Sequence, residues 1–297
     1  MIEVRQLRKV YGQKTVLKDL SFTVEPGVIT GFVGPNGAGK STTMKIVAGF
    51  ESPTSGVALV DGVAYAQSAS PTQTLGCCMG AEFLPLSMSG PAFLRYQCRT
   101  AGLKGVDVDE VLGFVGLVGV GGKRIGEYSL GMRQRIGIAS ALLGNPQNLM
   151  FDEPINGLDV NGIIWLRDLL RAQADAGKTV FLSSHIMSEL EMVADRVIMI
   201  NDGVVSASGG VEELEEAAGS AGAGVIVKSE DMDALRRLLE DNGLAFESSG
   251  PSLVVRGIAA RDLGRLVYAN GLSLDHLETK RKSLEDLYLS TKGASHE

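Results

Sequence analysis

Apolar side chains recur with a period of two over parts of this chain and with helical spacing over others. Alternation within the first 85 residues predicts strands at 2–7, 17–24, 28–33 and 57–60. Residues from about 91 to 144 change to helical spacing broken by glycines. From residue 148 the two patterns alternate, which predicts strands at 149–151 and 179–183 and helices at 161–176 and 188–194. Strands alternating with helices indicate a parallel α/β sheet that is covered on both faces.

A change in composition follows this region. Residues 212–216 are acidic, and residues 217–224 contain only alanine, glycine and serine, which is typical of a flexible linker. Beyond them, strands are expected at 225–227 and 253–256 and helices at 232–242, 260–270 and from 283 onward. We therefore predict a main domain at 1–217, a linker at 218–224 and a small α+β domain at 225–297.

The clearest chemical signal lies between the strand at 28–33 and a helix predicted at 42–49. The intervening residues fit the pattern G-x-x-x-x-G-K-[ST] in full: Gly34, Pro35, Asn36, Gly37, Ala38, Gly39, Lys40, Ser41 and Thr42. Such a loop turns backbone N–H groups toward phosphates at a helix N-terminus. Lys40 is then expected to reach the β- and γ-phosphates, and Ser41 to bind Mg²⁺. The alternative is a chance match in a chain with 38 glycines, which the flanking strand and helix disfavour.

Three further segments carry candidate chemistry. The strand at 149–151 ends in Asp152 and Glu153, where one carboxylate can serve Mg²⁺ and the other an attacking water. His185 follows the strand at 179–183 and can contact a γ-phosphate, although a lone histidine is more often structural. Ser129 and Gly131 open a helix predicted at 132–143, whose N-terminus can receive phosphate or can be an ordinary capped end.

Bulk properties narrow the classes of function. A net charge of −7 without a basic cluster argues against nucleic acid as the main partner. An apolar fraction of 44% suits a globular protein, no apolar run is long enough to span a membrane, and no signal-peptide core precedes the first strand. Cys77, Cys78 and Cys98 lack zinc-site spacing, so we expect reduced, packed thiols in a cytosolic compartment.

In this order, the elements resemble an ABC-transporter nucleotide-binding domain over residues 1–217. The resemblance assigns residues 34–42 to Walker A and Asp152 with Glu153 to Walker B and its catalytic glutamate. It also identifies Ser129 and Gly131 with the signature, Asp159 with the D-loop, His185 with the switch histidine and Tyr11 with the aromatic residue that stacks on adenine. Residues 129–135, 153–159 and 184–191, and less specifically the tail 282–289, are similar to bacterial daunorubicin- and bacitracin-resistance exporter subunits.

The resemblance carries expectations about fold, ligands and partners. The fold would be a P-loop ATPase cassette with a mainly parallel sheet, an antiparallel β subdomain and a helical subdomain at about 87–145. The ligands would be ATP and Mg²⁺. The partners would be a second copy, which completes each ATP site, and a separately encoded transmembrane permease, with the chain bound peripherally at the cytoplasmic face of the plasma membrane. Export is the expected direction; an importer, a non-transport ABC ATPase and a weakly hydrolysing regulatory subunit are the alternatives.

Two motifs depart from the family pattern. Leu130 and Met132 stand where the signature has a glycine and a glutamine. The Q-loop glutamine is also absent: Gly80 occupies its ungapped position, and Glu82 is the only polar candidate nearby. These departures bear on γ-phosphate contact, metal coordination and coupling, and leave the other motifs unchanged.

Overall fold

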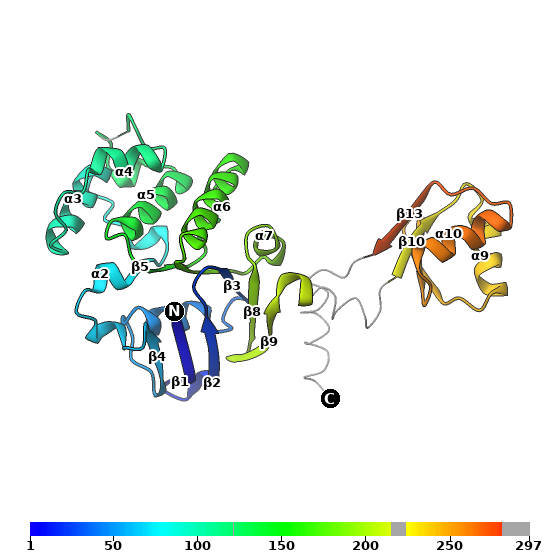
Figure 1. Ribbon diagram of the computed structural model, residues 1–297, viewed down its shortest axis with the longest axis horizontal. Helices are drawn as coiled ribbons and strands as arrows, with labels where there is room; N and C mark the ends of the chain where they lie inside the picture. The colour runs from blue at the N-terminus through cyan, green and yellow to red at the C-terminus, as the bar shows by residue number, and fades with distance from the viewer. Residues whose placement is uncertain (121, 215–223, 281–297) are drawn as a thin grey trace. The chain divides into compact units, whose positions relative to one another are not determined.

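The computed structural model describes residues 1–120, 122–214 and 224–280. They belong to two compact units, Met1–Gly210 and Val211–Glu297 (Figure 1). Residues 218–223 of the predicted linker and the predicted helix from residue 283 lie outside the described residues.

The first unit contains two sheets. A three-stranded antiparallel sheet has the order β2-β1-β4, and a six-stranded sheet has the order β5-β6-β7-β3-β8-β9, in which only β9 is antiparallel to its neighbour. The strands are β1 (Ile2–Tyr11), β2 (Lys14–Val24), β3 (Ile29–Val33), β4 (Ser55–Val60), β5 (Leu75–Cys78), β6 (Asn148–Phe151), β7 (Thr179–Ser184), β8 (Arg196–Asn201) and β9 (Val204–Gly210). This arrangement confirms the mainly parallel core and the antiparallel β region expected from the sequence.

The core of this unit lies between the two sheets. Three rings from β2, β3 and β7, those of Phe22, Phe32 and Phe181, meet with centroids 5.3 to 5.8 Å apart. Every residue of β3, β6 and β7 is buried, as expected for parallel strands covered on both faces. Replacing a buried phenylalanine by alanine typically lowers the free energy of unfolding by about 3–5 kcal/mol. Because the rings come from both sheets, this cluster helps to hold the sheets together.

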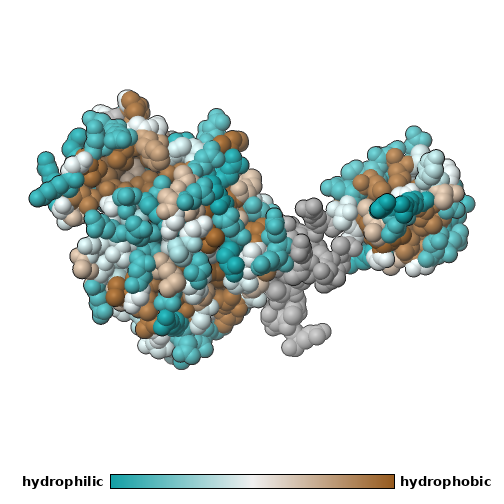
Figure 2. Space-filling model, viewed as in Figure 1, coloured by the Kyte–Doolittle hydropathy of each residue, from teal (hydrophilic) through white to brown (hydrophobic). Residues whose placement is uncertain are grey.

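Helices cover the six-stranded sheet and build a separate lobe. They are α1 (Lys40–Val47), α2 (Pro71–Thr74), α3 (Gly90–Thr100), α4 (Val108–Phe114), α5 (Leu130–Leu142), α6 (Val160–Asp175) and α7 (Met187–Glu191). Helices α3, α4 and α5 lie together (Figure 1) and share a core that includes Leu94, Ile125 and Ile136. Apolar side chains also reach the surface over this lobe (Figure 2), among them Phe114 and Val118. No helix among the described residues is long and apolar enough to cross a membrane.

Several helix boundaries differ from the sequence-based expectation; α1, for example, spans Lys40–Val47 and not 42–49. Helix α5 begins at Leu130, two residues before the predicted start, because the Ser129 hydroxyl accepts the Met132 N–H and caps it. Helix α7 is shorter than the predicted 188–194, ending at Glu191, and its buried Leu190 packs against β3 at Gly31. A Cβ at Gly31 would lie 2.9 Å from the Leu190 Cδ1 atom, so the glycine allows this close helix–strand contact.

The second unit has a βαββαβ order with both helices on one face of its sheet. Its elements are β10 (Gly224–Lys228), α9 (Met232–Asp241), β11 (Phe246–Ser249), β12 (Ser252–Arg256), α10 (Ala260–Ala269) and β13 (His276–Lys280). The sheet order β13-β10-β12-β11 is antiparallel throughout, which is a ferredoxin-like arrangement. Leu235, Leu239, Leu263 and Val267 from the helices pack with Val225 and Val255 in a core of its own.

The three cysteines are free thiols in the first unit. Burial raises the pKa of Cys77 to about 12 and that of Cys78 to about 11, and it also raises the pKa of Cys98. A thiol with a pKa near 12 is only about one part in ten thousand thiolate at pH 8, and the thiolate is the reactive form. Cys77 and Cys78 are therefore unreactive toward electrophiles in the folded chain.

Alkylation rates test this statement. At pH 8, iodoacetamide should modify Cys77 and Cys78 roughly a thousandfold more slowly in the native chain than in urea, where the pKa returns to about 8.5. Peptide mass spectrometry over a time course would give both rates. Native modification at the unfolded rate would contradict the burial of these thiols.

Separate cores in the two units predict that the first unit folds without the second. A chain truncated after Ser220 should keep its thermal transition and its affinity for a fluorescent ATP analogue, because the phosphate loop and the carboxylates all lie before Gly210. Circular dichroism and fluorescence titration would measure both. Loss of nucleotide binding in a well-folded truncation would contradict this division.

Candidate functional site

The phosphate loop joins the buried strand β3 to the first turn of α1. Gly37 and Gly39 have φ values of +85° and +110°, a backbone region that favours glycine. Gly34 is required for space, since a Cβ there would lie 2.2 Å from the Ile200 carbonyl oxygen of β8. The conformation therefore depends on glycine at three positions, and it leaves the N-terminus of α1 open for an anion.

Lys40 is almost fully buried at the base of this loop. Its Nζ donates to the Gly34 carbonyl at 2.7 Å and to the Pro35 carbonyl at 3.4 Å, and it lies 3.8 Å from Oε1 of Glu153. Burial lowers the pKa of Lys40, and the carboxylates of Glu153 and Asp152 oppose that shift. The ammonium is thus held by loop carbonyls and attracted by two anions across the site.

Asp152 and Glu153 follow β6 at the same edge of the sheet. Phe151 is in register with Leu182 of β7, and Val33 at the end of β3 is in register with Ser184. Parallel pairing therefore brings the ends of three strands beside the loop. Ser183 links the two acids: its hydroxyl donates to Oδ1 of Asp152 at 2.5 Å and accepts the Glu153 N–H at 2.9 Å.

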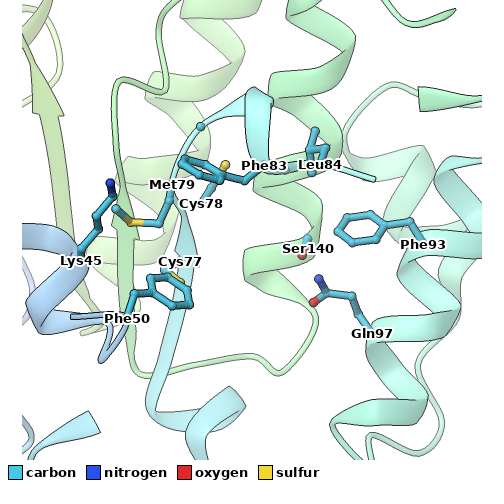
Figure 3. Close-up of a pocket in the computed structure, with 12 residues that line it drawn as sticks. Lys45, Phe50, Cys77, Cys78, Met79, Phe83, Leu84, Phe93, Gln97 and Ser140 are labelled. Carbon is cyan, nitrogen blue, oxygen red and sulfur yellow. The ribbon is translucent and has the colours of Figure 1, made fainter. Parts of the chain in front are cut away.

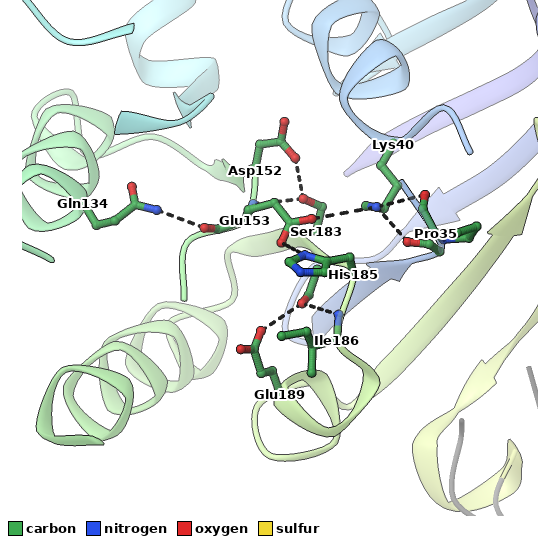
Figure 4. Close-up of polar contacts among 11 residues, drawn as sticks. Pro35, Lys40, Gln134, Asp152, Glu153, Ser183, His185, Ile186 and Glu189 are labelled. Atoms are coloured by element: carbon green, nitrogen blue, oxygen red, sulfur yellow. Dashed lines mark hydrogen bonds and ion pairs between the residues drawn. The ribbon is translucent and has the colours of Figure 1, made fainter. Parts of the chain in front are cut away.

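Glu153 is held from several sides (Figure 4). Its backbone has φ of +51°, unusual for a residue with a side chain. One carboxylate oxygen contacts Nδ1 of His185 at 2.8 Å, the other faces Lys40, and the Glu153 carbonyl accepts from the side chain of Gln134 at 2.9 Å. The carboxylate therefore lies between an ammonium and an imidazole at the mouth of the loop.

These groups surround one open cavity of about 480 Å³. Its walls include the predicted Asn36, Gly37, Gly39, Lys40, Ser41, Thr42, Glu153 and His185. Lys14, Val16 and Asn156 also line it and were not singled out from the sequence. Gly34, Pro35 and Ala38 are not among the lining residues, and Asp152 is buried with a hydrogen bond from Ser183.

Ser129, Gly131 and Asp159 lie outside this cavity. Ser129 caps α5, and Asp159 caps α6 by accepting the Gly162 N–H at 2.8 Å. Gly131 packs against the segment that precedes α6, where a Cβ would be 2.9 Å from the Gly157 carbonyl oxygen. A single copy of the chain therefore does not bring the predicted signature residues to its own phosphate loop.

Tyr11 lies at the end of β1 and is also outside the residues that line the cavity. Its hydroxyl hydrogen-bonds to Glu51, and the Lys9 ammonium is 4.7 Å from its ring centroid. Partial burial and the Glu51 carboxylate raise the pKa of Tyr11. About 44% of this side chain is exposed, so the ring is accessible to a planar ligand.

The segment after β5 contains the position of the absent glutamine. Gly80 has φ of +117°, and a Cβ there would lie 2.4 Å from Oε2 of Glu82. The Glu82 carboxylate thus occupies the space that a side chain at residue 80 would enter. Glycine at residue 80 allows the positive φ, and the Glu82 carboxylate packs against its Cα.

Two buried polar residues in this site had no part in the sequence-based assignment. Ser183 lies within a fully buried strand and Gln134 within a buried stretch of α5. Ser183 follows the apolar run of β7, whereas Gln134 stands between Arg133 and Arg135, so its burial has no signal in the sequence. The partner of each residue becomes visible only when β6, β7 and α5 are placed together.

A second, apolar groove of about 370 Å³ lies between α1, β5, α3 and α5 (Figure 3). Phe50, Met79, Phe83, Leu84 and Phe93 are among the side chains that line it. Phe50 and Phe83 are 65% and 63% exposed, and the Lys45 ammonium lies 5.9 Å from the Phe83 ring centroid. The Asp152 N–H donates to the carbonyl of Cys78 at 2.8 Å. This hydrogen bond links β5, which borders the groove, to the residue that follows β6.

Comparison with known proteins places this geometry in a family. The family model described as ABC transporter matches residues 17–156, and a model described as a domain of unknown function (DUF8746) matches residues 223–285. The lantibiotic transport ATP-binding protein SrtF of Streptococcus pyogenes is 35% identical over 219 residues, which cover 73% of this chain and 95% of that protein. The bacitracin transport ATP-binding protein BcrA of Bacillus licheniformis is 37% identical over 206 residues, covering 68% of this chain and 67% of that protein.

Full-length similarity also exists. The uncharacterized ABC transporter ATP-binding protein YxlF of Bacillus subtilis is 32% identical over 299 residues, covering 97% of this chain and 98% of that protein. A solved structure titled as the ATP binding subunit of an ABC transporter superposes with a TM-score of 0.66 at 27% identity, covering 74% of this chain and 93% of that one. With its phosphate loop, acidic strand end and helical lobe in this arrangement, the chain belongs to the ATP-binding subunits of ABC transporters, and among them it is similar to proteins named for lantibiotic and bacitracin transport.

Proposed function

We propose that the chain hydrolyses Mg-ATP and thereby powers export through a separately encoded membrane subunit. The observation that carries this proposal is the position of Glu153 between Lys40 and His185 at the mouth of the phosphate loop. The loop backbone, Lys40 and Thr42 would bind the phosphates, and the exposed ring of Tyr11 would stack on adenine.

The residues present suit Mg²⁺. Ser41 supplies a hydroxyl at the cavity wall, and Asp152 supplies a carboxylate that Ser183 orients. Oxygen donors are what this hard cation prefers, and it usually takes only one or two protein ligands together with phosphates and waters. Bound there, the metal would neutralise charge on the β- and γ-phosphates.

Glu153 and His185 fit the hydrolytic step. The Glu153 carboxylate would accept a proton from the attacking water, whose oxygen then forms the new bond to the γ-phosphorus as the bond to the leaving oxygen breaks. His185, already 2.8 Å from Glu153, would orient this carboxylate and the γ-phosphate. The Lys40 ammonium would leave the loop carbonyls and bind the phosphate oxygens. The negative charge of the phosphates would then offset the free-energy cost of burying the ammonium.

A second copy completes the proposed site. Ser129 and Gly131 do not reach the cavity of their own chain, so we assign them to the ATP held by the partner copy, with Asp159 at the same interface. ATP between two copies would close the dimer, and release of phosphate would open it.

We assign the apolar groove to the membrane subunit and place the chain peripherally at the cytoplasmic face. The groove exposes Phe50 and Phe83 beside a strand that is hydrogen-bonded to the Asp152 backbone. A helix of the permease seated there would gain apolar burial and would move the element that carries the metal ligand. Lantibiotic or bacitracin transport in the names of the relatives favours export of an antibiotic-like molecule over the importer and non-transport alternatives.

Substitution of Glu153 tests the mechanism. Glu153→Gln keeps the size of the side chain but removes the charge that attracts the proton of water. The variant should bind Mg-ATP and hydrolyse it at least about a hundredfold more slowly, with ATP-bound dimers accumulating. Phosphate release and gel filtration with ATP would measure both effects. Turnover at the wild-type rate would mean that another group acts as the base.

Two controls separate chemistry from binding. Asp152→Asn should weaken Mg²⁺ dependence and nucleotide affinity together, while Lys40→Ala should abolish measurable ATP binding in a folded chain because the buried ammonium is lost. Tight ATP binding by Lys40→Ala would contradict the assignment of the loop.

The groove makes a separate prediction. Phe83→Asp places a charge on an exposed groove side chain, so it should keep the fold and ATP binding yet reduce the fraction of the chain that sediments with membranes of the native host by about tenfold. Phe114→Asp is the matched control, since Phe114 is 55% exposed and lies outside the groove. Equal sedimentation of Phe83→Asp and wild type would exclude this surface.

A further inference from the structure

Gln134 is the buried polar group that the proposed mechanism leaves without a role. It lies on α5, one turn after the cap at Ser129, and only 3% of it is exposed. Its Nε2 donates to the Glu153 carbonyl oxygen at 2.9 Å (Figure 4). This contact joins the helical lobe directly to the backbone of the residue whose carboxylate faces the phosphate loop.

The orientation of the Gln134 amide follows from its partner. A carbonyl oxygen can only accept a hydrogen bond, so the NH₂ end of the amide must face Glu153 and the oxygen must face away. That oxygen, Oε1, is buried and has no hydrogen-bond partner among the residues that the structure describes. An unpaired buried acceptor lowers stability and therefore needs an explanation other than stability.

The backbone of Glu153 adopts a disfavoured conformation, so hydrogen bonds to it matter. Its residue has φ of +51°, a conformation disfavoured by roughly 1–2 kcal/mol for L-residues with a side chain. Ser183 holds the N–H of Glu153, and Gln134 holds its carbonyl. Together they fix both ends of the residue, and hence the direction in which its carboxylate leaves the backbone.

We propose that Gln134 is a positioning residue for hydrolysis: its amide holds Glu153 in the left-handed conformation and ties the carboxylate to the helix that begins at Ser129. This inference rests on the proposed ATPase function and adds a residue to it. Gln134 is not among the residues that line the phosphate-loop cavity. It acts through the backbone of Glu153, and this orientation leaves its own Oε1 without a hydrogen bond from the described residues.

The first experiment compares wild type with Gln134→Met, which keeps length and volume but lacks a donor. The maximal rate should fall about tenfold and the KM for ATP should stay within twofold, since the phosphate loop is unchanged. The melting temperature should change little, because loss of the unpaired Gln134 oxygen offsets loss of the hydrogen bond to the Glu153 carbonyl. An unchanged rate in the variant would overturn the proposal.

The Glu153→Gln background shows whether the effect runs through Glu153. Single-turnover phosphate release should fall about tenfold for Gln134→Met in the wild-type background and less than twofold in the Glu153→Gln background. Equal falls in both would mean that Gln134 acts elsewhere and would overturn the proposal. If the wild-type chain itself released no phosphate, the proposed function would fail instead.

A second variant keeps the test decisive if Gln134→Met does not fold. In Gln134→Glu, a protonated carboxyl can donate to the Glu153 carbonyl, whereas an ionised one repels it. Burial raises a carboxyl pKa, so the rate relative to wild type should increase as the pH falls from 8 to 6. A ratio independent of pH would overturn the proposal.

Arg135→Met is the matched control on the same helix. Arg135 donates to the Val115 carbonyl at 3.0 Å and lies over the Trp165 ring, away from the phosphate loop. Its loss should lower the melting temperature and leave the rate per folded molecule unchanged. A rate loss equal to that of Gln134→Met would show that any damage to α5 slows hydrolysis, and would overturn a specific role for Gln134.

Discussion

Parallel pairing of β6, β7 and β3 is the constraint on which the site depends. These strands come from distant parts of the chain, yet the register of β7 with both neighbours brings their carboxyl ends to one edge. The phosphate loop, the two carboxylates and the histidine each leave the sheet there. Burial of all three strands on both faces fixes this register, because a slip would force apolar side chains out of contact.

Charge at that edge is balanced across the cavity. Lys40 is buried with its ammonium on loop carbonyls, and the opposing carboxylates favour its charged form. Glu153 in turn lies between Lys40 and His185. A triphosphate bound here would bring negative charge to the ammonium and would compete with Glu153 for it.

Positive φ values occur around the cavity both at glycines and at one residue with a side chain, Glu153. Gly37 and Gly39 have positive φ values that glycine adopts readily, whereas Glu153 adopts a left-handed conformation despite its side chain. That strain is local, and hydrogen bonds from Ser183 and Gln134 hold it. Strained residues of this kind are typical of sites where a side chain has to point in one direction.

The sequence by itself determined the phosphate loop, the alternation of strands and helices and the family. Those features are local: a G-x-x-x-x-G-K-[ST] loop and a two-residue or helical period can be recognised within ten to twenty residues. It also indicated the four candidate groups Lys40, Asp152, Glu153 and His185. Only the tertiary structure showed which of these lie together, that Tyr11 and Ser129 are outside the cavity walls, and that Gly80 is covered by Glu82. Ser183 and Gln134 could not be assigned beforehand, because their hydrogen bonds to Glu153 join residues 30 and 19 positions apart and follow no periodic pattern in the chain.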